Sequence, residues 1–516
     1  MDKAAGQQGA GRMDGGATGQ QCDQSNPVHV LRPCCGQASG VVAHPINSGG
    51  GPITIIGNAA QSPTSVAPAA THMQCRFKRL IHSSACSSLR VLSPGVPHMR
   101  TPPAPLSLME RDRRWALARD IMANERLDAL VVHGDREAAA PAGFSPDCYF
   151  TNDRPGSIVV FVGDQPPRVF TFASLMIADH LQAGLRGDLQ WIAPEQLWVG
   201  KSGQEVGRWL QQCGLRSARI GVLGLEPYPP FYFDGAMPAR TLQGMQAAVP
   251  GAEFVPVYRA FFQRASVKSQ EELALIAHAA WIGESMSEAL RTTARPGVSE
   301  AELVAAVTAT CFSLGGYTAE VLLGSGPEYV GWGPPAWQYR AQPPRILRDG
   351  DLVLSEIFAL YGLMETQHQA AVAIGEVHED IHRSAAVARS SYEAGLSALR
   401  VGNTFGDVVD AMEAPLLEAG GWHVHPLVHS LNPYGPIGFG RAPGIEALPE
   451  AARYAHIAPL PTVGRELPLL AGMCFAFEPN CAFGRHMANI GGTVIVGAEA
   501  GIALNENSTG LMQADA

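Results

Sequence analysis

The residues best suited to chemistry in this chain are a few carboxylates and imidazoles set in apolar stretches. Residues 351–375, DLVLSEIFALYGLMETQHQAAVAIG, contain Glu356, Glu365 and His368, and Glu478 lies in the apolar segment MCFAFEPN. An unpaired carboxylate is costly to bury, so Glu478 is expected to have a partner or a function. A positioned imidazole speeds proton transfer by about 10² to 10⁴, and burial can move a carboxyl pKa toward 7. Acid–base chemistry is therefore the first expectation.

Two histidines, His425 and His429, lie four residues apart in the segment HPLVHSL. Two histidines in isolation are more often a partly buried, hydrogen-bonded pair on a loop than a reactive site, so their types alone decide nothing. Glu365 and His368 are expected to be exposed or to line a cavity beside the hairpin. Gln367 and His368 are predicted to lie in the substrate pocket.

Residues 322–340, LLGSGPEYVGWGPPAWQYR, form a loop rich in glycine and aromatic residues that suits the wall of a pocket. Tyr339 is the pocket residue predicted from this loop. The Gly-x-Gly in it is not followed by a helical pattern, so a phosphate-binding loop is not indicated.

The elements that must position these residues divide the chain into parts. A charged amphipathic helix is predicted at 108–127, and further helical stretches lie between predicted strands, which indicates an α/β domain over residues 106–262. The strands are predicted from runs of β-branched and aromatic residues at 128–134, 156–162, 168–173 and 219–225.

The second part, residues 263–516, has the pattern of an α+β domain. Ser269 with Glu272, and Ser299 with Glu302, have the spacing of a capping box and predict the starts of two helices. Two more helices are predicted at 379–398 and 404–421, and strand pairs at 351–375 and 470–497.

Residues 1–105 are expected to be a disordered or misassigned extension. No Asp or Glu occurs from Gln24 to Met109, and the stretch is rich in Gly, Ser, Pro and Gln. Residues 73–90 are basic and rich in serine, as organelle transit peptides are, but such peptides normally begin at the N-terminus. A start codon at Met99 or Met109 is the other explanation.

Composition excludes several classes of function. The 516 residues carry a net charge of −10, whereas nucleic-acid and anionic-membrane binders need a basic surface. No apolar run reaches the roughly 20 residues of a membrane span. The ten cysteines show no CxxC pair and no regular spacing, which favours a reducing, cytoplasmic location. A small-molecule partner is expected, with neither nucleic acid nor membrane.

Four segments of the second part resemble, in order and spacing, the motifs of a known family. The chain resembles the Xaa-Pro aminopeptidase, prolidase and creatinase family, which is peptidase family M24. The resemblance implies a creatinase-like α/β domain over 106–262, followed by a pita-bread domain over 263–516. The segments are RDGDLVLSEI at 348–357, HPLVHSL at 425–431, AGMCFAFEPN at 471–480 and IGGTVIV at 490–496.

In the metal-dependent members, five side chains hold two divalent ions that activate a bridging water. The resemblance places these five positions on Glu356, Gln367, His429, Glu478 and Gly491. Gln367 has only a neutral carbonyl oxygen to offer, and Gly491 offers no ligand. Because these two positions serve both ions in the family, the remaining ligands are divided between two sides. No metal is therefore expected, while manganese, zinc, cobalt or iron remains possible if another residue substitutes.

Two further positions depart from the family hydrolases. The histidine that steadies developing negative charge falls on Tyr339, and the histidine that assists proton transfer falls on Pro436. His425 matches an additional histidine of the aminopeptidase P-like members. The resemblance also implies a homodimer, because two-domain relatives usually pair.

Three functions remain open at this point. The first is a metal-independent hydrolase of an amide, Xaa-Pro-like or amidine bond in a small or dipeptide-like substrate, similar to creatinases. Its acid–base residues would be His429 and Glu478, supported by Glu356 and His425. The second is a metal-dependent Xaa-Pro peptidase with an unusual ligand set. The third is a binding protein that has lost catalysis.

Overall fold

The computed structural model describes residues 101–134, 144–227, 234–456 and 460–515. The predicted disordered or misassigned extension lies, up to residue 100, outside the described residues. From Leu106 onward the chain is packed: Leu106 is buried, and its carbonyl oxygen accepts a hydrogen bond from Trp191 Nε1. No helix of the described part is both long enough and apolar enough to cross a membrane.

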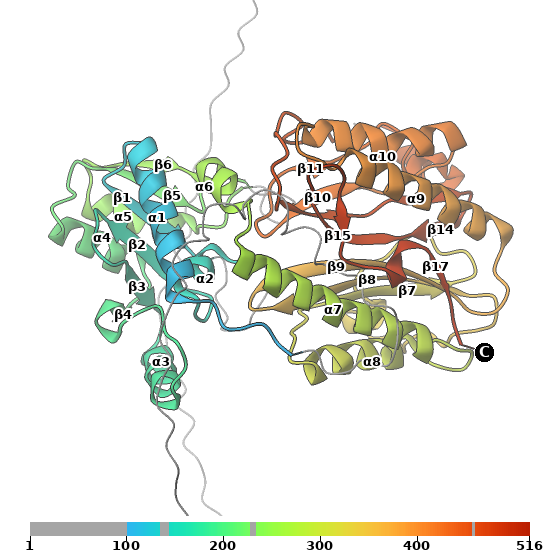
Figure 1. The fold of residues 1–516 in the computed structure, drawn as a ribbon, viewed down its shortest axis with the longest axis horizontal. Helices are drawn as coiled ribbons and strands as arrows, with labels where there is room; N and C mark the ends of the chain where they lie inside the picture. The colour runs from blue at the N-terminus through green and yellow to red at the C-terminus, as the bar shows by residue number, and fades with distance from the viewer. Residues whose placement is uncertain (1–100, 135–143, 228–233, 457–459, 516) are drawn as a thin grey trace, which may run out of the picture. The chain divides into compact units, whose positions relative to one another are not determined.

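The first domain has a mixed six-stranded sheet with the strand order β4-β3-β2-β1-β5-β6 (Figure 1). β1 pairs antiparallel with β2 and parallel with β5, so it lies in the middle of the sheet. The strands are β1 (Ala129–His133), β2 (Ile158–Val162), β3 (Arg168–Thr171), β4 (Leu197–Val199), β5 (Arg219–Leu223) and β6 (Glu253–Pro256). The sequence predicted β1, β2, β3 and β5 but missed β4 and β6.

Side chains alternate between the two sides of this sheet along each strand, and helices pack on both sides. On one side Val131 and Val160 pack with Met245 of α5, and on the other Val132 and Phe161 pack with Trp115 of α1. The helices are α1 (Leu108–Asn124), α2 (Pro146–Thr151), α3 (Ser174–Arg186), α4 (Gly203–Gln212), α5 (Ala239–Ala248) and α6 (Tyr258–Ala265).

The second domain is built on a nine-stranded sheet. Its main path is β11-β10-β12-β15-β9-β8-β7, with β16 added beside β15 and β17 beside β9, and a separate hairpin is formed by β13 and β14. The strands are β7 (Val321–Gly326), β8 (Leu352–Tyr361), β9 (Met364–Ala373), β10 (Val428–Leu431), β11 (Ile437–Gly438), β12 (Cys474–Phe477), β13 (Asn480–Phe483), β14 (His486–Asn489), β15 (Gly491–Ile495), β16 (Ile502–Ala503) and β17 (Leu511–Gln513).

Two pairs of helices pack on this sheet (Figure 1). α7 (Gln270–Thr293) and α8 (Glu300–Ser313) pack on β7, β8 and β9, and α9 (Glu379–Ala398) and α10 (Phe405–Ala419) pack on β10, β12 and β15. Both predicted capping boxes are present, at Ser269 with Glu272 and at Ser299 with Glu302. The predicted helices at 379–398 and 404–421 correspond to α9 and α10.

Glu272 joins the first helix of the second domain to the first helix of the chain. Its carboxylate accepts the backbone N–H of Ser269 at 2.8 Å and lies 3.0 Å from Arg113 and 3.1 Å from Arg114. Glu272 and Arg114 are buried, and Glu110 forms the second carboxylate partner of both arginines. Two guanidinium groups are therefore held between two carboxylates at the junction of α1 and α7.

The substitution Glu272→Gln tests this network. Glutamine preserves the capping box but removes a charge from between two arginines, and breaking a buried pair typically costs about 3–5 kcal/mol. We expect a loss of that order in the free energy of unfolding, measured with urea. Glu302→Gln is the matched control, because Glu302 caps α8 at an exposed position. Equal, small losses in the two variants would contradict the structural role of the charge.

Candidate functional site

The pairing of β8 with β9 decides which polar side chains share a surface. Directly opposed residues of an antiparallel pair project from the same face. Glu356 is opposite Gln369, and Gln367 is opposite Phe358. Glu356, Glu365, Gln367 and Gln369 therefore project from one face of the sheet, and this face carries the candidate site.

His429 and Glu478 join the site from β10 and from the end of β12. Nε2 of His429 lies 3.0 Å from Oε1 of Glu478, and Nδ1 lies 3.0 Å from the carbonyl oxygen of Ser430. Both side chains are buried. Burial alone would lower the pKa of His429, but the hydrogen bond and charge of Glu478 outweigh burial and raise the pKa to about 9. The imidazole is thus held as a cation at neutral pH.

Glu356, unlike His429, is held in its neutral form. Burial raises the pKa of Glu356 to about 8, and the nearby charge of Glu478 acts in the same direction. Gln369 and His429 partly offset this shift, as does Trp332, whose Nε1 donates to Oε2 of Glu356 at 3.0 Å. Glu356 is therefore a protonated carboxylic acid at neutral pH, beside an imidazolium–carboxylate pair.

The other carboxylate of this face, Glu365, is fully engaged by its neighbours. Both of its oxygens lie 2.7 Å from the hydroxyl of Tyr434, and Gln367 Nε2 donates to Oε1 at 2.9 Å. Glu365 is buried, so the expectation of an exposed or cavity-lining side chain is wrong. Its role in the structure is to fix the side-chain amide of Gln367.

His368 lies on the other face of the hairpin. It is fully buried, and its Nδ1 lies 3.3 Å from Oε1 of Glu284 in α7. A side chain at Gly283 would overlap the imidazole, so helix α7 packs directly on it. The structure therefore corrects the prediction for His368: this side chain is in the helix–sheet interface and not in a pocket with Gln367.

Two other predicted residues have ring contacts outside the cluster. The ring of His425 packs against His423 and Phe439, and burial lowers the pKa of His425. Tyr339 is 63% exposed, and its ring lies under the guanidinium of Arg340. The supporting role of His425 and the pocket role of Tyr339 stay predictions.

Trp332 and Gln369 are site residues that sequence reasoning missed. Trp332 belongs to the loop predicted as a pocket wall. Its hydrogen bond to Glu356 forms only when this loop is folded, so the sequence did not reveal it. Gln369 follows Gln367 with the period of two that a strand imposes, which was the available signal. Its Oε1 accepts a hydrogen bond from Asn489 Nδ2 at 2.8 Å, which orients the amide beside Glu356.

The five positions that the resemblance assigns to two metal ions offer two carboxylates and one imidazole, on Glu356, Glu478 and His429, besides the amide of Gln367. Gly491 is opposite Gln369, so its position does face the site, but its φ is +123° and a Cβ would overlap the carbonyl oxygen of Phe477. Nε2 of His429 is already bound to Glu478. Among the described residues, the one group of three or more possible ligands within 4.8 Å of one another lies elsewhere, at His378, Asp380 and His486. A dinuclear centre therefore does not fit these side chains.

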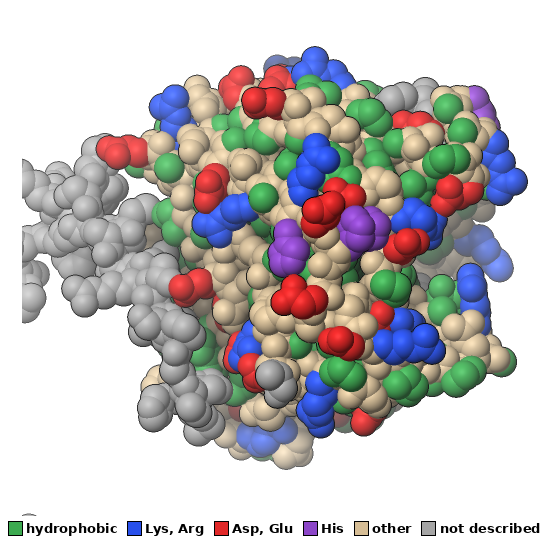
Figure 2. Space-filling view, turned by 90° about the vertical axis from the view of Figure 1, so that its right-hand side faces the viewer, with side chains coloured by type: hydrophobic (Ala, Val, Ile, Leu, Met, Phe, Trp, Pro, Cys, Tyr) green, Lys and Arg blue, Asp and Glu red, His purple; other side chains and the backbone are tan. Residues whose placement is uncertain are grey.

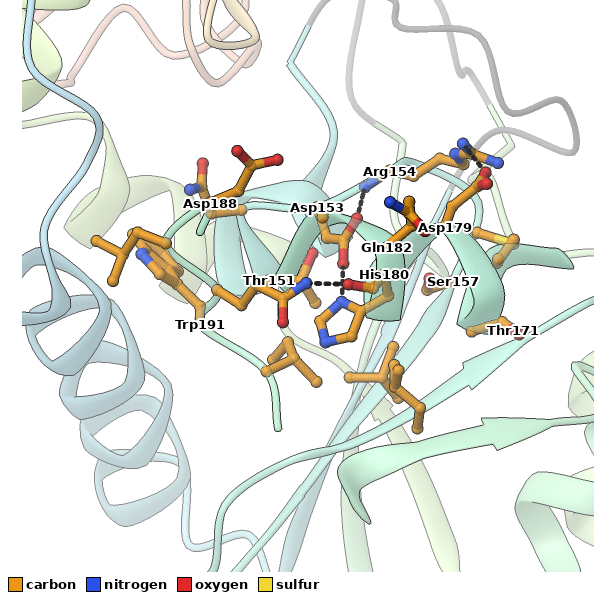
Figure 3. Close-up of a pocket in the computed structure, with 18 of the residues that line it drawn as sticks. Thr151, Asp153, Arg154, Ser157, Thr171, Asp179, His180, Gln182, Asp188 and Trp191 are labelled. Atoms are coloured by element: carbon orange, nitrogen blue, oxygen red, sulfur yellow. Dashed lines mark hydrogen bonds and ion pairs between the residues drawn. The ribbon is translucent and has the colours of Figure 1, made fainter. Parts of the chain in front are cut away.

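A cavity of about 450 Å³ lies in the first domain, between α3 and the sheet (Figure 3). His180 and Asp153 point toward each other there, with Nδ1 of His180 2.8 Å from the carboxylate. The other charged residues of its wall form pairs, Arg154 with Asp179 and Arg186 with Asp188. The charges of this wall are thus matched among themselves.

The comparison with known families covers most of the second domain. Residues 274–498 match the model of Metallopeptidase family M24. The match begins in α7 and ends just beyond β15, so it includes every position of the acid–base cluster.

Curated relatives are similar over a similar length. The "Probable dipeptidase PepE" proteins of Mycobacterium bovis and Mycobacterium tuberculosis are 28% identical over 215 residues. The aligned residues are 41% of this chain and 50% of each relative, so the chain spans about half the length of the curated relatives it matches.

Solved structures cover both domains. The dipeptidase PepE from Mycobacterium ulcerans has a TM-score of 0.57 at 22% identity, covering 80% of this chain and 99% of that one. The X-Pro aminopeptidase from Thermotoga maritima has a TM-score of 0.57 at 16% identity, with 78% and 99% coverage. The prolidase from Pyrococcus horikoshii has a TM-score of 0.56 at 15% identity, with 76% and 98% coverage. These similarities confirm the predicted fold, an α/β domain followed by a pita-bread domain.

The pKa of Glu356 predicts how stability depends on pH. Its value of about 8 in the folded chain exceeds the ordinary 4.5, so the folded chain binds this proton more tightly. Stability from Glu356 is therefore fully present below pH 4.5 and is lost as pH rises through 8. Relative to the wild type, Glu356→Gln should gain free energy of unfolding between pH 5 and 8, on the order of a few kcal/mol.

Urea unfolding at several pH values measures this difference. His429, whose pKa is raised from 6.5 to about 9, contributes stability that is lost over pH 6.5–9. Because the charge of Glu356 is one of the causes that raise the pKa of His429, the difference between the two proteins at pH 5–6.5 reports Glu356 by itself. Parallel curves for the variant and the wild type from pH 5 to 8 would show that Glu356 is already ionised at neutral pH.

Proposed function

From the membership of residues 274–498 in metallopeptidase family M24, we propose that this chain is a hydrolase of a C–N bond in a small substrate that works without a dinuclear metal centre. The observation that carries the proposal is the buried cluster of a protonated Glu356 beside the His429–Glu478 pair. Acid–base catalysis usually depends on neighbouring titratable groups whose pKa values differ, so that one is protonated while another is ionised at the same pH.

Each member of the cluster has a separate role in this proposal. The carboxylate of Glu478 takes a proton from the attacking water, and His429 holds that carboxylate in place with its imidazolium N–H. Glu356 donates its proton to the leaving nitrogen, which lets the C–N bond break. Trp332 and Gln369 position Glu356, and Glu365 fixes the amide of Gln367, which is available to bind a polar group of the substrate. His425 keeps the supporting role predicted for it.

The substrate class follows from the relatives. Those named above are described as dipeptidases, an X-Pro aminopeptidase and a prolidase. A dipeptide-like or Xaa-Pro-like amide is therefore the proposed substrate, with an amidine as the alternative among C–N bonds. On the face shown in Figure 2, basic and acidic side chains are interspersed among other residues, which suits a small ligand better than a nucleic acid.

Substitution at Glu478 and Glu356 tests the proposed chemistry. With a panel of dipeptides, Xaa-Pro peptides and guanidino compounds, we expect Glu478→Gln and Glu356→Gln each to lower kcat by about 10² to 10⁴, because each removes a proton-transfer group. The wild-type rate should fall as pH rises above about 8, where Glu356 loses its proton. Glu302→Gln, at an exposed helix cap, is the control and should keep full activity.

Metal removal distinguishes the alternatives. Activity should survive dialysis against a chelator. Loss of turnover with recovery on adding manganese, zinc, cobalt or iron would establish a metal-dependent Xaa-Pro peptidase instead. Tight binding of a panel compound without turnover would establish a binding protein on this scaffold.

We also propose that the chain is a cytoplasmic homodimer. Its five described cysteines are free, which suits a reducing compartment. β4 is an edge strand of the first sheet, and exposed apolar residues lie on it and around α3. Exposed apolar side chains grouped beside a sheet edge are typical of protein interfaces. They are Phe172, Leu175, Leu181, Leu185, Leu189, Trp198 and Val199.

The homodimer is tested by the variant Leu185→Glu. Leu185 is 82% exposed, so a charge there leaves the monomer fold intact and disfavours only a covered interface. We expect light scattering to give the mass of two chains for the wild type and of one chain for the variant. Val401→Glu places the same charge on an exposed apolar residue of the second domain and should remain dimeric. A monomeric wild type would refute the proposal.

A further inference from the structure

A second group of possible metal ligands lies away from the acid–base cluster, on the surface of the second domain. The imidazole rings of His378 and His486 are stacked, with centroids 3.9 Å apart and planes 5° from parallel. Nδ1 of His378 lies 3.7 Å from Oδ2 of Asp380. One ligand atom from each of the three residues lies within 4.8 Å of the others. Binding of one ion by both imidazoles requires the rings to rotate out of this stack, because an imidazole coordinates a metal ion in the plane of its ring.

The three residues come from two elements that are fixed to each other. His378 is the N-cap of α9, Asp380 lies in its first turn, and His486 begins β14. Ser384 Oγ, in the second turn of α9, donates to the carbonyl oxygen of His486 at 2.9 Å. The backbone positions of the ligands are thus held by the fold, which lowers the entropy cost of assembling the site.

We propose that His378, Asp380 and His486 bind a divalent transition metal ion, with zinc as the best match. Two imidazoles and one carboxylate are ligands that zinc prefers, and three protein ligands leave a fourth position for water. Magnesium and calcium prefer oxygen ligands, so the two histidines disfavour them. The side chains of His378 and Asp380 are 48% and 31% exposed, which leaves the site open to solvent.

The charges around the site are compatible with a cation. The positive end of a helix dipole at the start of α9 opposes one, but Glu379 and Asp380 in the first turn offset it. Arg485, the neighbour of His486, is paired with Glu450 and with Glu328. The positive charge of Arg485 is therefore neutralised.

Metal binding at this point ties α9 to the β13–β14 hairpin. That hairpin begins with Asn480, whose side chain donates to the carbonyl oxygen of Glu478 at 3.0 Å and to that of Val424 at 2.8 Å. The bound ion thus stabilises a segment that supports the candidate site without touching it. Its effect is on the stability of this segment and is separate from the hydrolysis proposed above.

Isothermal titration of the full, untagged chain with zinc chloride tests the site. We expect one zinc ion per chain, and a loss of affinity of at least about tenfold in His486→Ala and in Asp380→Asn, since removing even an orienting partner of a metal ligand costs about 10- to 100-fold. Zinc should also raise the Tm of the wild type but not of His486→Ala, with circular dichroism confirming that both are folded. His382→Ala, on an exposed residue of the same helix, should bind like the wild type.

Two results would overturn the proposal. One is a wild-type chain that takes up no zinc, and the other is an affinity that His486→Ala and Asp380→Asn leave unchanged. The variant His429→Ala separates this site from the acid–base cluster. Zinc binding that is lost in His429→Ala and kept in His486→Ala would place the ion at the cluster, refuting both this site and the metal-free chemistry. Binding lost only in His486→Ala and Asp380→Asn leaves the proposed hydrolysis to be judged by its own variants.

Discussion

The hydrogen bond between His429 and Glu478 is the interaction on which the candidate site depends. Both groups are buried, where a single charge without a partner would be strongly destabilising. As a pair they keep opposite charges, and the negative member then makes it harder for Glu356 to ionise. Burial is the larger cause of the raised pKa of Glu356, and the charge of Glu478 adds to it. The chemical character of the site follows from this arrangement more than from any single residue.

Two of the positions that the resemblance assigns to metal ligands are held by contacts within the protein. At Gly491 the backbone has a left-handed φ and lies so close to Phe477 that a side chain would not fit. At Gln367 the amide is bound to Glu365, which is itself held by Tyr434. Nε2 of Gln367 is therefore engaged within the protein, while Oε1 of Gln367 is buried without a hydrogen-bond partner among the described residues. The site is organised as a buried polar network in which most members have partners within the chain.

A second buried network supports the junction between the two domains. Glu272 caps α7 and at the same time neutralises two arginines of α1. The local signal, a capping box, was visible in the sequence, but its tertiary use was not. Along the chain, the strands of the second domain all follow α7 and α8. The start of α7 therefore precedes every strand that carries a site residue.

The sequence by itself determined the local features of this protein. Capping boxes, strand runs and the alternation along β8 and β9 depend on residues a few positions apart, and they placed most helices and the strand pair that carries Glu356, whereas β10, which carries His429, was expected to be a loop. The resemblance to a known family brought Glu356, His429 and Glu478 into one candidate set. The tertiary structure decided which face each side chain takes and what it meets there. It separated His368 from Gln367, brought Trp332 to Glu356, and stacked His378 on His486. These contacts join residues that are distant in the chain or on opposite faces of one strand, and their geometry is fixed only when helices and sheets pack.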